Sequence, residues 1–378
     1  MEIYSTPVHP AGSGRPADAA FPYPDPCRPP PESQGHAAVE LLRPAWFSPL
    51  FARLLTGREV DAGEMTEAAR DILAGRVDDA LTAAVVTGLR MKGETGTEIA
   101  AAALALREQM SRLVPVTGPV VDTCGTGGDG AGTFNISTAA ALVTAGAGVP
   151  VVKHGNRAVS SQSGSADVLR ELGVPIESGP AWAQTCLDRL NFAFCYAPHF
   201  HPGMAHVAKL RRKLGVRTIF NLLGPLANPA SADYQLLGVG DPDLLDPLAA
   251  AAARLGIRRA ILVCSFDGLD EVSLTASTMV RIVEGDEFRA AEWRPSDFGL
   301  APAPLCEVTA SGPAESAAMV RTALSGADHA ATRLTLANAA AALYAAGAVT
   351  SLKDGVARAE ASVRGGAAAR VLAGLGRE

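Results

Sequence analysis

The sequence lacks an uninterrupted apolar run of the ~18 residues that a helix needs to cross a bilayer, so we expect no membrane partner. Its first residues also lack a basic stretch followed by an apolar one, which predicts that the chain is not secreted and is cytoplasmic. Aromatic residues are scarce, at 5%, yet 48% of the residues are hydrophobic. This composition is typical of a globular protein and excludes a largely disordered one.

An excess of positive charge is also missing, since the formal net charge is −6. Domains that bind nucleic acid are usually basic, so we expect no nucleic-acid partner. The six cysteines include no C-x-x-C pair and no Cys/His spacing typical of zinc, which favours reduced, packed thiols. Cys124 adjoins a glycine-rich segment, but no nearby His–acid arrangement supports a reactive thiolate there.

The length of 378 residues predicts two structural units. Residues 1–44 contain ten prolines, which predicts a flexible tail. In 45–115, apolar residues recur three and four apart in about four segments, which predicts a small all-helical domain. From there on, short apolar runs alternate with helical patterns, which predicts a larger α/β domain over 116–203 and 216–378. A basic helix around 204–215 interrupts this domain, and we expect it to join the helical one.

The fold class expected for the larger domain is α/β, with a mostly parallel central sheet flanked by helices. The predicted strands are 119–122, 149–152, 192–195, 235–239 and 260–264. The predicted helices are 137–147, 166–172, 181–190, 244–255 and 334–345.

The segment 125–130 (GTGGDG) follows the first predicted strand and formally matches the dinucleotide-binding pattern G-x-G-x-x-G. That pattern also needs an acidic residue about 20 residues further on. No Asp or Glu occurs in 131–166, and Lys153, His154 and Arg157 stand there instead, which argues against a dinucleotide site. A glycine turn before a helix N-terminus still favours phosphate, because backbone N–H groups can approach the anion. A tight turn with an ordinary helix cap is the alternative.

A second polar segment, 153–161 (KHGNRAVSS), follows the next predicted strand. It contains two cations, a histidine, an amide and two hydroxyl groups. In α/β sheets, ligands bind beyond the carboxyl ends of the strands, so this segment predicts an anion site. A solvated charged loop is the alternative interpretation.

Taken together, 125–130, 135–138 and 153–167 resemble the donor-binding signature of the anthranilate phosphoribosyltransferase family. The segments 201–204, 217–229 and 267–271 follow in the order typical of that family, and 58–110 resembles its N-terminal helices. The resemblance runs from about residue 46 to the end, with Gly203 standing where the family commonly has Ala. It implies the fold shared with pyrimidine nucleoside phosphorylases, a cleft between two domains, and a homodimer formed through the helical domain.

The resemblance implies transfer of the 5-phosphoribosyl group of phosphoribosyl pyrophosphate (PRPP) to the amino group of anthranilate, the second step of tryptophan synthesis from chorismate. It assigns Mg²⁺ to Ser137, Asp270 and Glu271, and anthranilate to Gly125, His154, Asn156, His201 and Arg211. No general base is expected, because an aniline nitrogen is already neutral at pH 7. It assigns PRPP to Gly125, Gly128, Asp129, Thr133, Asn135, Ile136, Ser137, Thr138, Lys153, His154, Gly155, Asn156, Arg157, Ala158, Val159, Ser160, Ser161 and Ser165.

Other interpretations remain for the individual residues and for the whole chain. The Asp270–Glu271 pair alone would fit a solvated acidic turn, and each histidine alone would fit a structural role. A nucleoside phosphorylase would use the same fold, but its usual phosphate-loop and base-recognition patterns are not seen. A non-catalytic relative that binds nucleic acid is disfavoured by the negative charge and by the presence of Asp270, Glu271 and Arg211. A copy that serves a specialised natural-product pathway stays open.

Overall fold

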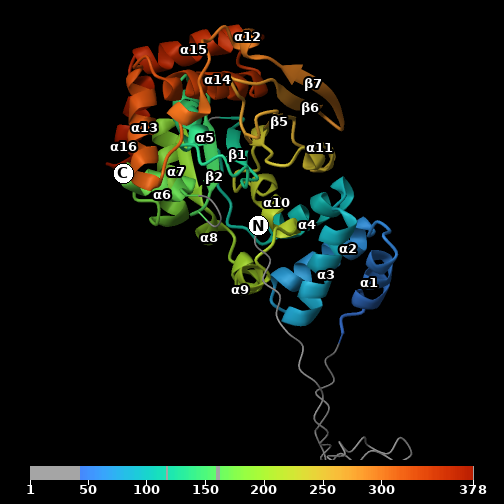
Figure 1. Ribbon diagram of the computed structural model, residues 1–378. Coiled ribbons are helices and arrows are strands. Elements are labelled where there is room, and N and C mark those ends of the chain that lie inside the picture. Colours follow the sequence, from blue (N-terminus) through green and yellow to red (C-terminus); the bar gives the residue numbers. More distant parts are fainter. Residues whose placement is uncertain (1–42, 116–117, 159–161, 378) are drawn as a thin grey trace, which may run out of the picture. The chain divides into compact units, whose positions relative to one another are not determined.

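The computed structural model describes residues 43–115, 118–158 and 162–377 (Figure 1). The predicted tail therefore lies outside the described residues except for its last two positions. Val159, Ser160 and Ser161 of the second polar segment lie outside them as well.

Four helices begin the described chain, which confirms the helical N-terminal part. Asp61 and Asp78 cap two of them by accepting hydrogen bonds from backbone N–H groups, and Thr95 forms a capping box with Glu98 at a third. Their bounds are α1 (Phe47–Leu55), α2 (Ala62–Leu73), α3 (Asp79–Lys92) and α4 (Gly96–Glu108).

The larger part is built on a seven-stranded sheet of order β3-β2-β1-β4-β5-β6-β7. The first five strands pair in parallel, while β6 and β7 add an antiparallel hairpin at one edge. The mostly parallel sheet predicted from the sequence is confirmed, whereas the hairpin was not predicted. The strands are β1 (Val121–Gly125), β2 (Val151–Gly155), β3 (Phe192–Tyr196), β4 (Tyr234–Gly238), β5 (Arg259–Ser265), β6 (Thr278–Glu284) and β7 (Glu287–Trp293).

Helices cover both faces of the sheet. One face packs against α5 and α14, and the other packs against α10 and α11. The five predicted helices of this part are confirmed, while most of those after residue 290 were not predicted. The helices and short 3₁₀ turns are α5 (Ile136–Gly146), α6 (Ser165–Glu171), α7 (Gly179–Leu190), α8 (Ala197–Phe200), α9 (Met204–Leu214), α10 (Ile219–Leu226), η1 (Pro242–Leu244), α11 (Leu245–Arg254), α12 (Pro295–Phe298), η2 (Leu305–Glu307), α13 (Pro313–Ser325), α14 (Ala330–Ala345), α15 (Leu352–Arg364) and α16 (Ala367–Leu375).

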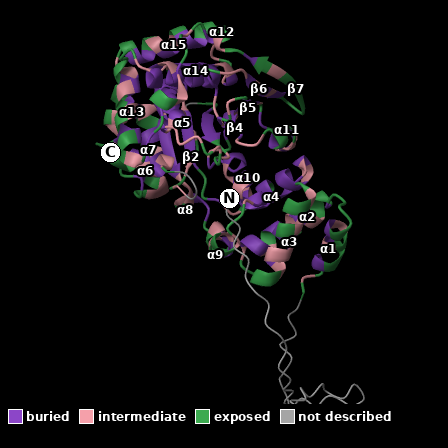
Figure 2. Ribbon diagram, viewed as in Figure 1, coloured by how far each residue is buried: buried purple, intermediate pink, exposed green. Residues whose placement is uncertain are grey.

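The side chains of β5 show how the two faces build two hydrophobic cores. Ile261 and Val263 belong to the core that contains α5 and α14, while Leu262 and Cys264 belong to the core on the opposite face. Figure 2 shows buried residues gathered in β2 and β4 and in α5 and α14, whereas the edge strand β7 is largely exposed. The second core continues without a break into α1–α4. The helical part therefore shares apolar packing with one face of the sheet.

Close backbone approach fixes α4 against α11. A Cβ atom on Gly96, at the start of α4, would lie only 2.6 Å from the Cβ of Ala250. The basic helix α9 lies against α2 and α3. Within the described ranges, no helix is long and apolar enough to cross a membrane.

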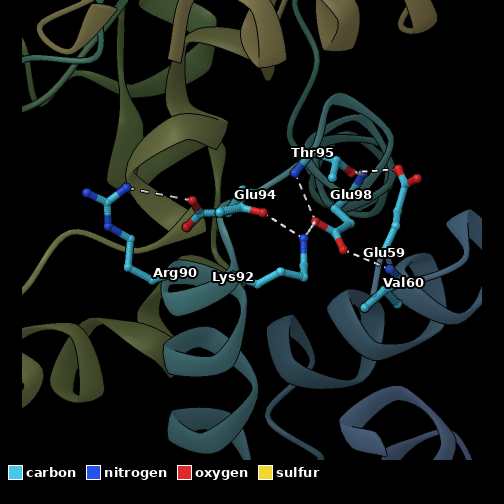
Figure 3. A network of polar contacts seen from close by, with 8 residues as sticks. Glu59, Val60, Arg90, Lys92, Glu94, Thr95 and Glu98 are labelled. Atoms are coloured by element: carbon cyan, nitrogen blue, oxygen red, sulfur yellow. Dashed lines mark hydrogen bonds and ion pairs between the residues drawn. The ribbon is translucent and has the colours of Figure 1, made fainter. Parts of the chain in front are cut away.

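A buried ion pair stabilises the connection between α3 and α4 (Figure 3). Glu98 is fully buried and accepts a hydrogen bond at 2.9 Å from Nζ of Lys92, whose side chain is 6% exposed. The same carboxylate accepts hydrogen bonds from the backbone N–H groups of Val60 and Thr95. This carboxylate therefore holds the start of α4 to the end of α3 and to the segment that precedes α2.

We expect Lys92→Met to lower the free energy of unfolding by about 3 kcal/mol, because it leaves the Glu98 carboxylate buried without its cation. Urea unfolding followed by circular dichroism measures this change. The control is Arg70→Met, which removes an exposed ion pair with Glu108 and should leave the urea midpoint nearly unchanged. Equal midpoints for the two variants would contradict the stabilising role of the buried pair.

Candidate active site

Most of the predicted site residues meet in one cavity of about 650 Å³ at the carboxyl ends of β1 and β2. Parallel pairing brings these strand ends together, so segments far apart in the sequence enclose a common space. The predicted residues that line it are Gly125, Gly128, Asp129, Thr133, Asn135, Ile136, Ser137, Lys153, His154, Gly155, Asn156, Arg157, Ala158, Ser165, His201, Arg211, Asp270 and Glu271.

Thr138 is the one described member of the predicted set that does not line the cavity. Its side chain is fully buried in α5, and its hydroxyl has no hydrogen-bond partner among the described residues. Thr138, in the first turn of α5, has its side chain in the core, so a contact with a ligand in the cavity is not supported.

The glycine-rich loop, residues 125–130, is anchored at its start by the sheet. The backbone N–H of Thr126 donates to the carbonyl of Gly238 at 2.8 Å. The next N–H, of Gly127, donates to Oδ2 of Asp270 at 3.1 Å. Gly127, Gly128 and Gly130 all have φ between +65° and +83°, a region that favours glycine and explains why this residue recurs.

Lys153 is the buried cation of the site. Its Nζ donates to the backbone carbonyl of Thr123 and, at 3.1 Å, to Oγ of Ser137. Burial lowers the pKa of the Lys153 ammonium group, while the carboxylate of Asp122 acts most strongly in the opposite direction. The cation is therefore held in a low-dielectric setting by carboxylates, which strengthens its attraction for an anion in the cavity.

Asp122 was not among the predicted site residues. Its carboxylate, on the inner strand β1, interacts electrostatically with Lys153 and, against the effect of burial, raises the pKa of that ammonium group. It is fully buried and accepts a hydrogen bond at 2.7 Å from the amide of Asn228. Burial raises the pKa of Asp122 to about 6, and Lys153 offsets part of this effect. Neither Asp122 nor Asn228 lies in the glycine-rich or the second polar segment, so sequence inspection gave no reason to connect these two residues.

Asp270 and Glu271 face the cavity from the turn after β5. Burial, together with the Asp129 carboxylate, raises the pKa of Asp270 to about 7. Burial and the neighbouring Asp270 raise the pKa of Glu271 well above its usual range. One Glu271 oxygen accepts a hydrogen bond from the backbone N–H of Ser137 at 3.0 Å. These carboxylates repel one another in a confined space, an arrangement that favours binding of a cation.

His154 and His201 form a buried pair of rings whose centroids are 4.8 Å apart. Nδ1 of His154 lies 2.8 Å from the carbonyl of Gly224, and because a carbonyl can only accept, Nδ1 carries the proton. Burial lowers the pKa of His154 to about 4 and that of His201 to about 3. The Ala227 backbone lies near the His201 ring, but neither ring nitrogen makes a hydrogen bond of standard geometry with a described residue.

The second polar loop lines the cavity and also makes contacts at its exposed rim. Asp167, at the start of α6, accepts hydrogen bonds from the backbone N–H groups of Ala158 and Gly164 and holds the two ends of the loop together. Arg157 forms an exposed ion pair with Glu177, so this carboxylate offsets part of the positive charge that Arg157 brings to the cavity.

Arg211 enters the cavity from α9. It is partly buried, and its guanidinium makes no ion pair or side-chain hydrogen bond with any residue that the structure describes. Burial lowers the pKa of Arg211, although an arginine remains charged at neutral pH. A partly buried guanidinium without a carboxylate partner is suited to bind a planar carboxylate from a ligand.

Ser316 is a site residue that sequence reasoning missed. Its hydroxyl donates to Oδ1 of Asn135 at 2.9 Å and accepts from the backbone N–H of Asn135 at the same distance. Ser163 donates to the same Oδ1 at 3.0 Å. The amide oxygen of Asn135 is therefore occupied by two hydroxyl groups, which fixes the orientation of its side chain. Ser316 lies on α13, 181 residues away, and no local motif marks it.

Comparisons with known proteins agree with this geometry. Residues 48–110 match the helical bundle domain of a glycosyl transferase family, and 117–369 match its a/b domain. An anthranilate phosphoribosyltransferase of Moorella thermoacetica is 47% identical over 85% of this chain and 95% of its own length. The structure of the Thermus thermophilus enzyme of that name superposes with a TM-score of 0.81 at 42% identity, over 87% of this chain and 99% of that one.

The anthranilate phosphoribosyltransferase of Saccharomyces cerevisiae in complex with PRPP and Mg has a TM-score of 0.80 and 31% identity, and covers 88% of this chain and 97% of that one. The fold and the two matched domains define a glycosyl transferase with an anion-binding cavity. Within that class, the chain belongs to the anthranilate phosphoribosyltransferase family.

We expect the histidine pair to lower the stability of the folded protein as the pH drops below about 6.5, the ordinary pKa of histidine, whereas the raised pKa values of Asp122 and Asp270 act in the opposite direction. Because the pKa values of His154 and His201 are lowered in the folded state, only the unfolded chain gains these protons between pH 6.5 and about 4. Each ring should then lower the free energy of unfolding by on the order of 2 kcal/mol at pH 5 relative to pH 7. Urea unfolding at the two pH values measures the loss.

The double variant His154→Asn with His201→Asn should be more stable at pH 5, relative to its stability at pH 7, than the unmodified chain is, because the variant lacks the contribution of these two rings while the carboxylates are unchanged. The control is His206→Asn, which changes an exposed histidine of α9 and should retain the pH dependence of the unmodified chain. A pH dependence that is identical in all three proteins would refute the assignment.

Proposed function

We propose that this chain transfers the 5-phosphoribosyl group of PRPP to the amino group of anthranilate, giving N-(5-phosphoribosyl)anthranilate and pyrophosphate. This reaction is the second step of tryptophan synthesis from chorismate. One observation carries the proposal: a single cavity joins an anion-binding loop, a buried ammonium group and a carboxylate pair to an unpaired guanidinium on another element. These parts match a donor that carries several phosphates and an acceptor that carries one carboxylate.

The donor would lie between the glycine-rich loop and the second polar loop. Lys153 and the N-terminus of α5 would offset the phosphate charge, and the hydroxyl of Ser137 would contribute a hydrogen bond. The orientation of Asn135 leaves only part of its amide group for a ligand, because its oxygen accepts from two hydroxyl groups and its Nδ2 donates to the carbonyl of Ser163 at 3.4 Å. The other predicted donor-binding residues, apart from Thr138, stay assigned to PRPP on the grounds of resemblance.

The residues present also fit Mg²⁺. Among the described residues there is no cluster of three or more His, Cys, Asp or Glu side chains arranged to hold a metal. Magnesium in phosphate-transfer sites usually takes only one or two carboxylates and completes its shell with substrate phosphates and water. Asp270 and Glu271, with the hydroxyl of Ser137, supply oxygen ligands whose mutual repulsion a divalent cation would relieve. When bound, the ion would stabilise the negative charge on the departing pyrophosphate.

The acceptor would bind against α9, where Arg211 can make two hydrogen bonds to its carboxylate. Gly125, Asn156 and the buried histidine pair line the same cavity. Because both rings stay neutral at physiological pH, they add no charge that would attract a second anion to this end of the cavity. An aryl amine is neutral at that pH too, so a neutral setting suits it.

The chemistry proposed is substitution at C1 of the ribose, through a transition state with positive charge on the sugar. The buried carboxylates and Lys153 are positioned in advance, so catalysis rests on orientation of the two substrates and on electrostatic stabilisation. No side chain is assigned as a general base, because the nucleophilic nitrogen needs no deprotonation before it attacks.

The homodimer, the cytoplasmic location and the domain limits also stay proposals. The homodimer is proposed to form through the helical part. Leu55 on α1 and Met91 on α3 support this, because these large apolar side chains are 73% and 84% exposed there. Analytical ultracentrifugation of the whole chain tests the oligomeric state.

We expect the double variant Asp270→Asn, Glu271→Gln to lose Mg²⁺-dependent turnover by at least ~100-fold, because neutral amides bind the cation poorly. Turnover is followed by the loss of anthranilate fluorescence in the presence of PRPP and Mg²⁺. The chain offers a matched control in Asp286→Asn, Glu287→Gln, which changes an adjacent acidic pair that is exposed in the β6–β7 turn. Near-normal turnover of the first variant would refute the metal assignment.

We expect Arg211→Ala to raise the KM for anthranilate about 10- to 100-fold, the loss typical of a hydrogen bond between charged groups. The KM for PRPP should change about twofold or less. Steady-state kinetics with each substrate varied in turn separates the two values. Arg212→Ala, on the exposed side of the same helix, should change neither constant. Equal effects of Arg211→Ala on both substrates would exclude its role in acceptor binding.

A further inference from the structure

Arg217 lies between α9 and α10 and reaches across to the glycine-rich loop. Its guanidinium donates to the carbonyl of Gly127 at 2.7 Å and to the carbonyl of Thr126 at 3.4 Å. A Cβ atom on Gly128 would lie 2.2 Å from Nη1 of Arg217, so the arginine fits there only because residue 128 is glycine. Arg217 makes no ion pair with a carboxylate of the described residues. Its hydrogen bonds therefore serve the backbone of the loop.

The orientation of these two carbonyls determines where the following N–H groups point. In a trans peptide the C=O and N–H groups point in opposite directions, and the described chain has no cis peptide bond. The Thr126 carbonyl faces Arg217, while the N–H of the same peptide unit, on Gly127, donates to Asp270. The Gly127 carbonyl also faces Arg217, which turns the N–H of Gly128 away from the guanidinium.

The N–H groups of the next three residues are available to a ligand. Those of Gly128, Asp129 and Gly130 have no hydrogen-bond partner within the described part of the chain. Consecutive N–H groups of this kind form a concave site that binds anions. A polyanion is attracted only while these groups face it, because the opposite orientation presents carbonyl oxygens and repels it.

Nothing in the local backbone holds that orientation by itself. The sheet anchors the loop through Thr126, whose N–H bonds to Gly238 and whose hydroxyl accepts from Gly240. Beyond that point the chain runs through Gly127 and Gly128, whose peptide units can rotate at little steric cost. Arg217 and Asp270 hold this peptide segment from two sides, and the hydroxyl of Thr126 adds a long contact of 3.4 Å to the Gly127 carbonyl.

We infer that Arg217 is a positioning residue of the donor site, which holds the carbonyls of Thr126 and Gly127 toward its own guanidinium so that the N–H of Gly128 is turned to the phosphates. This inference rests on the proposed function. It also connects the donor loop to the end of α9, the helix that carries the acceptor-binding Arg211. An arginine is suited to this role because its planar fork can reach two carbonyls at once, whereas an ammonium group is a single point of charge.

The test compares Arg217→Met, Arg217→Lys and the control Arg212→Met in the full-length protein. Titration calorimetry in Mg²⁺ gives the Kd for PRPP, and kinetics give the KM for anthranilate. We expect Arg217→Met to raise the Kd at least ~10-fold, Arg217→Lys to raise it by less, and the KM for anthranilate to stay within about twofold. The control should match the unmodified chain in both constants.

A second measurement needs no ligand. In protein labelled with ¹⁵N glycine, the heteronuclear NOE of Gly127, Gly128 and Gly130 should fall in Arg217→Met and fall less in Arg217→Lys, because the loop gains motion on the picosecond to nanosecond timescale. The control should show unchanged values. If Arg217→Met does not fold, Arg217→Lys alone decides, and a loop as rigid as in the unmodified chain would then overturn the inference.

Two further results would overturn the inference. The first is an unchanged Kd for PRPP in Arg217→Met. The second is a raised Kd with loop dynamics unchanged in both variants, and with the affinity restored by Arg217→Lys, since that pattern would indicate a direct contact between the charge and the ligand. Failure of the unmodified chain to bind PRPP would instead refute the proposed function. The NOE values would still test whether Arg217 restricts the motion of the glycine-rich loop.

Discussion

The site depends on opposite charges buried together at the ends of parallel strands. Lys153 lies in the field of Asp122, Asp270 and Glu271, and burial shifts each of these groups toward its neutral form. Such buried groups stay charged only when an opposite charge lies close by, because water no longer screens or solvates them. The carboxylates outnumber the ammonium group, so the arrangement is suited to take up a cation together with phosphate groups.

The acceptor end of the cavity follows a different electrostatic rule. Its histidines are kept neutral by burial, and its one guanidinium has no carboxylate partner among the described residues. A small aromatic acid can therefore supply a carboxylate partner for this guanidinium. A polyanion would be attracted more strongly to the proposed donor site, where Lys153 and the glycine-rich loop lie. Under the proposed function, these two settings would favour different substrates within one cavity.

Packing between the helical part and the sheet fixes the positions of Arg211 and the glycine-rich loop relative to each other. One hydrophobic core runs from α1–α4 through α10 and α11 to the strands, and α4 approaches α11 closely at Gly96. The helix that carries Arg211 packs on α2 and α3, and the residues after it reach the glycine-rich loop. The acceptor helix is thus tied both to the helical part and to the donor loop.

The sequence by itself determined the features that are local in the chain. The glycine-rich loop, the polar loop with Lys153, the acidic pair and the amphipathic helices each occupy a few consecutive residues, so their backbone preferences and chemistry are visible without a structure. The alternating strands and helices likewise predicted the parallel sheet, because buried parallel strands are short apolar runs.

Only the tertiary structure decided which distant residues support those loops. The contacts of Ser316 with Asn135, of Asn228 with Asp122 and of Arg217 with Gly127 join positions 181, 106 and 90 residues apart. The β6–β7 hairpin is itself local, since Glu284 pairs with Glu287 across two residues, but its place beside β5 at the sheet edge was decided by tertiary contacts. Periodicity and motifs describe neighbours along the chain, whereas these partners become neighbours only after the strands have paired and the helices have packed on them.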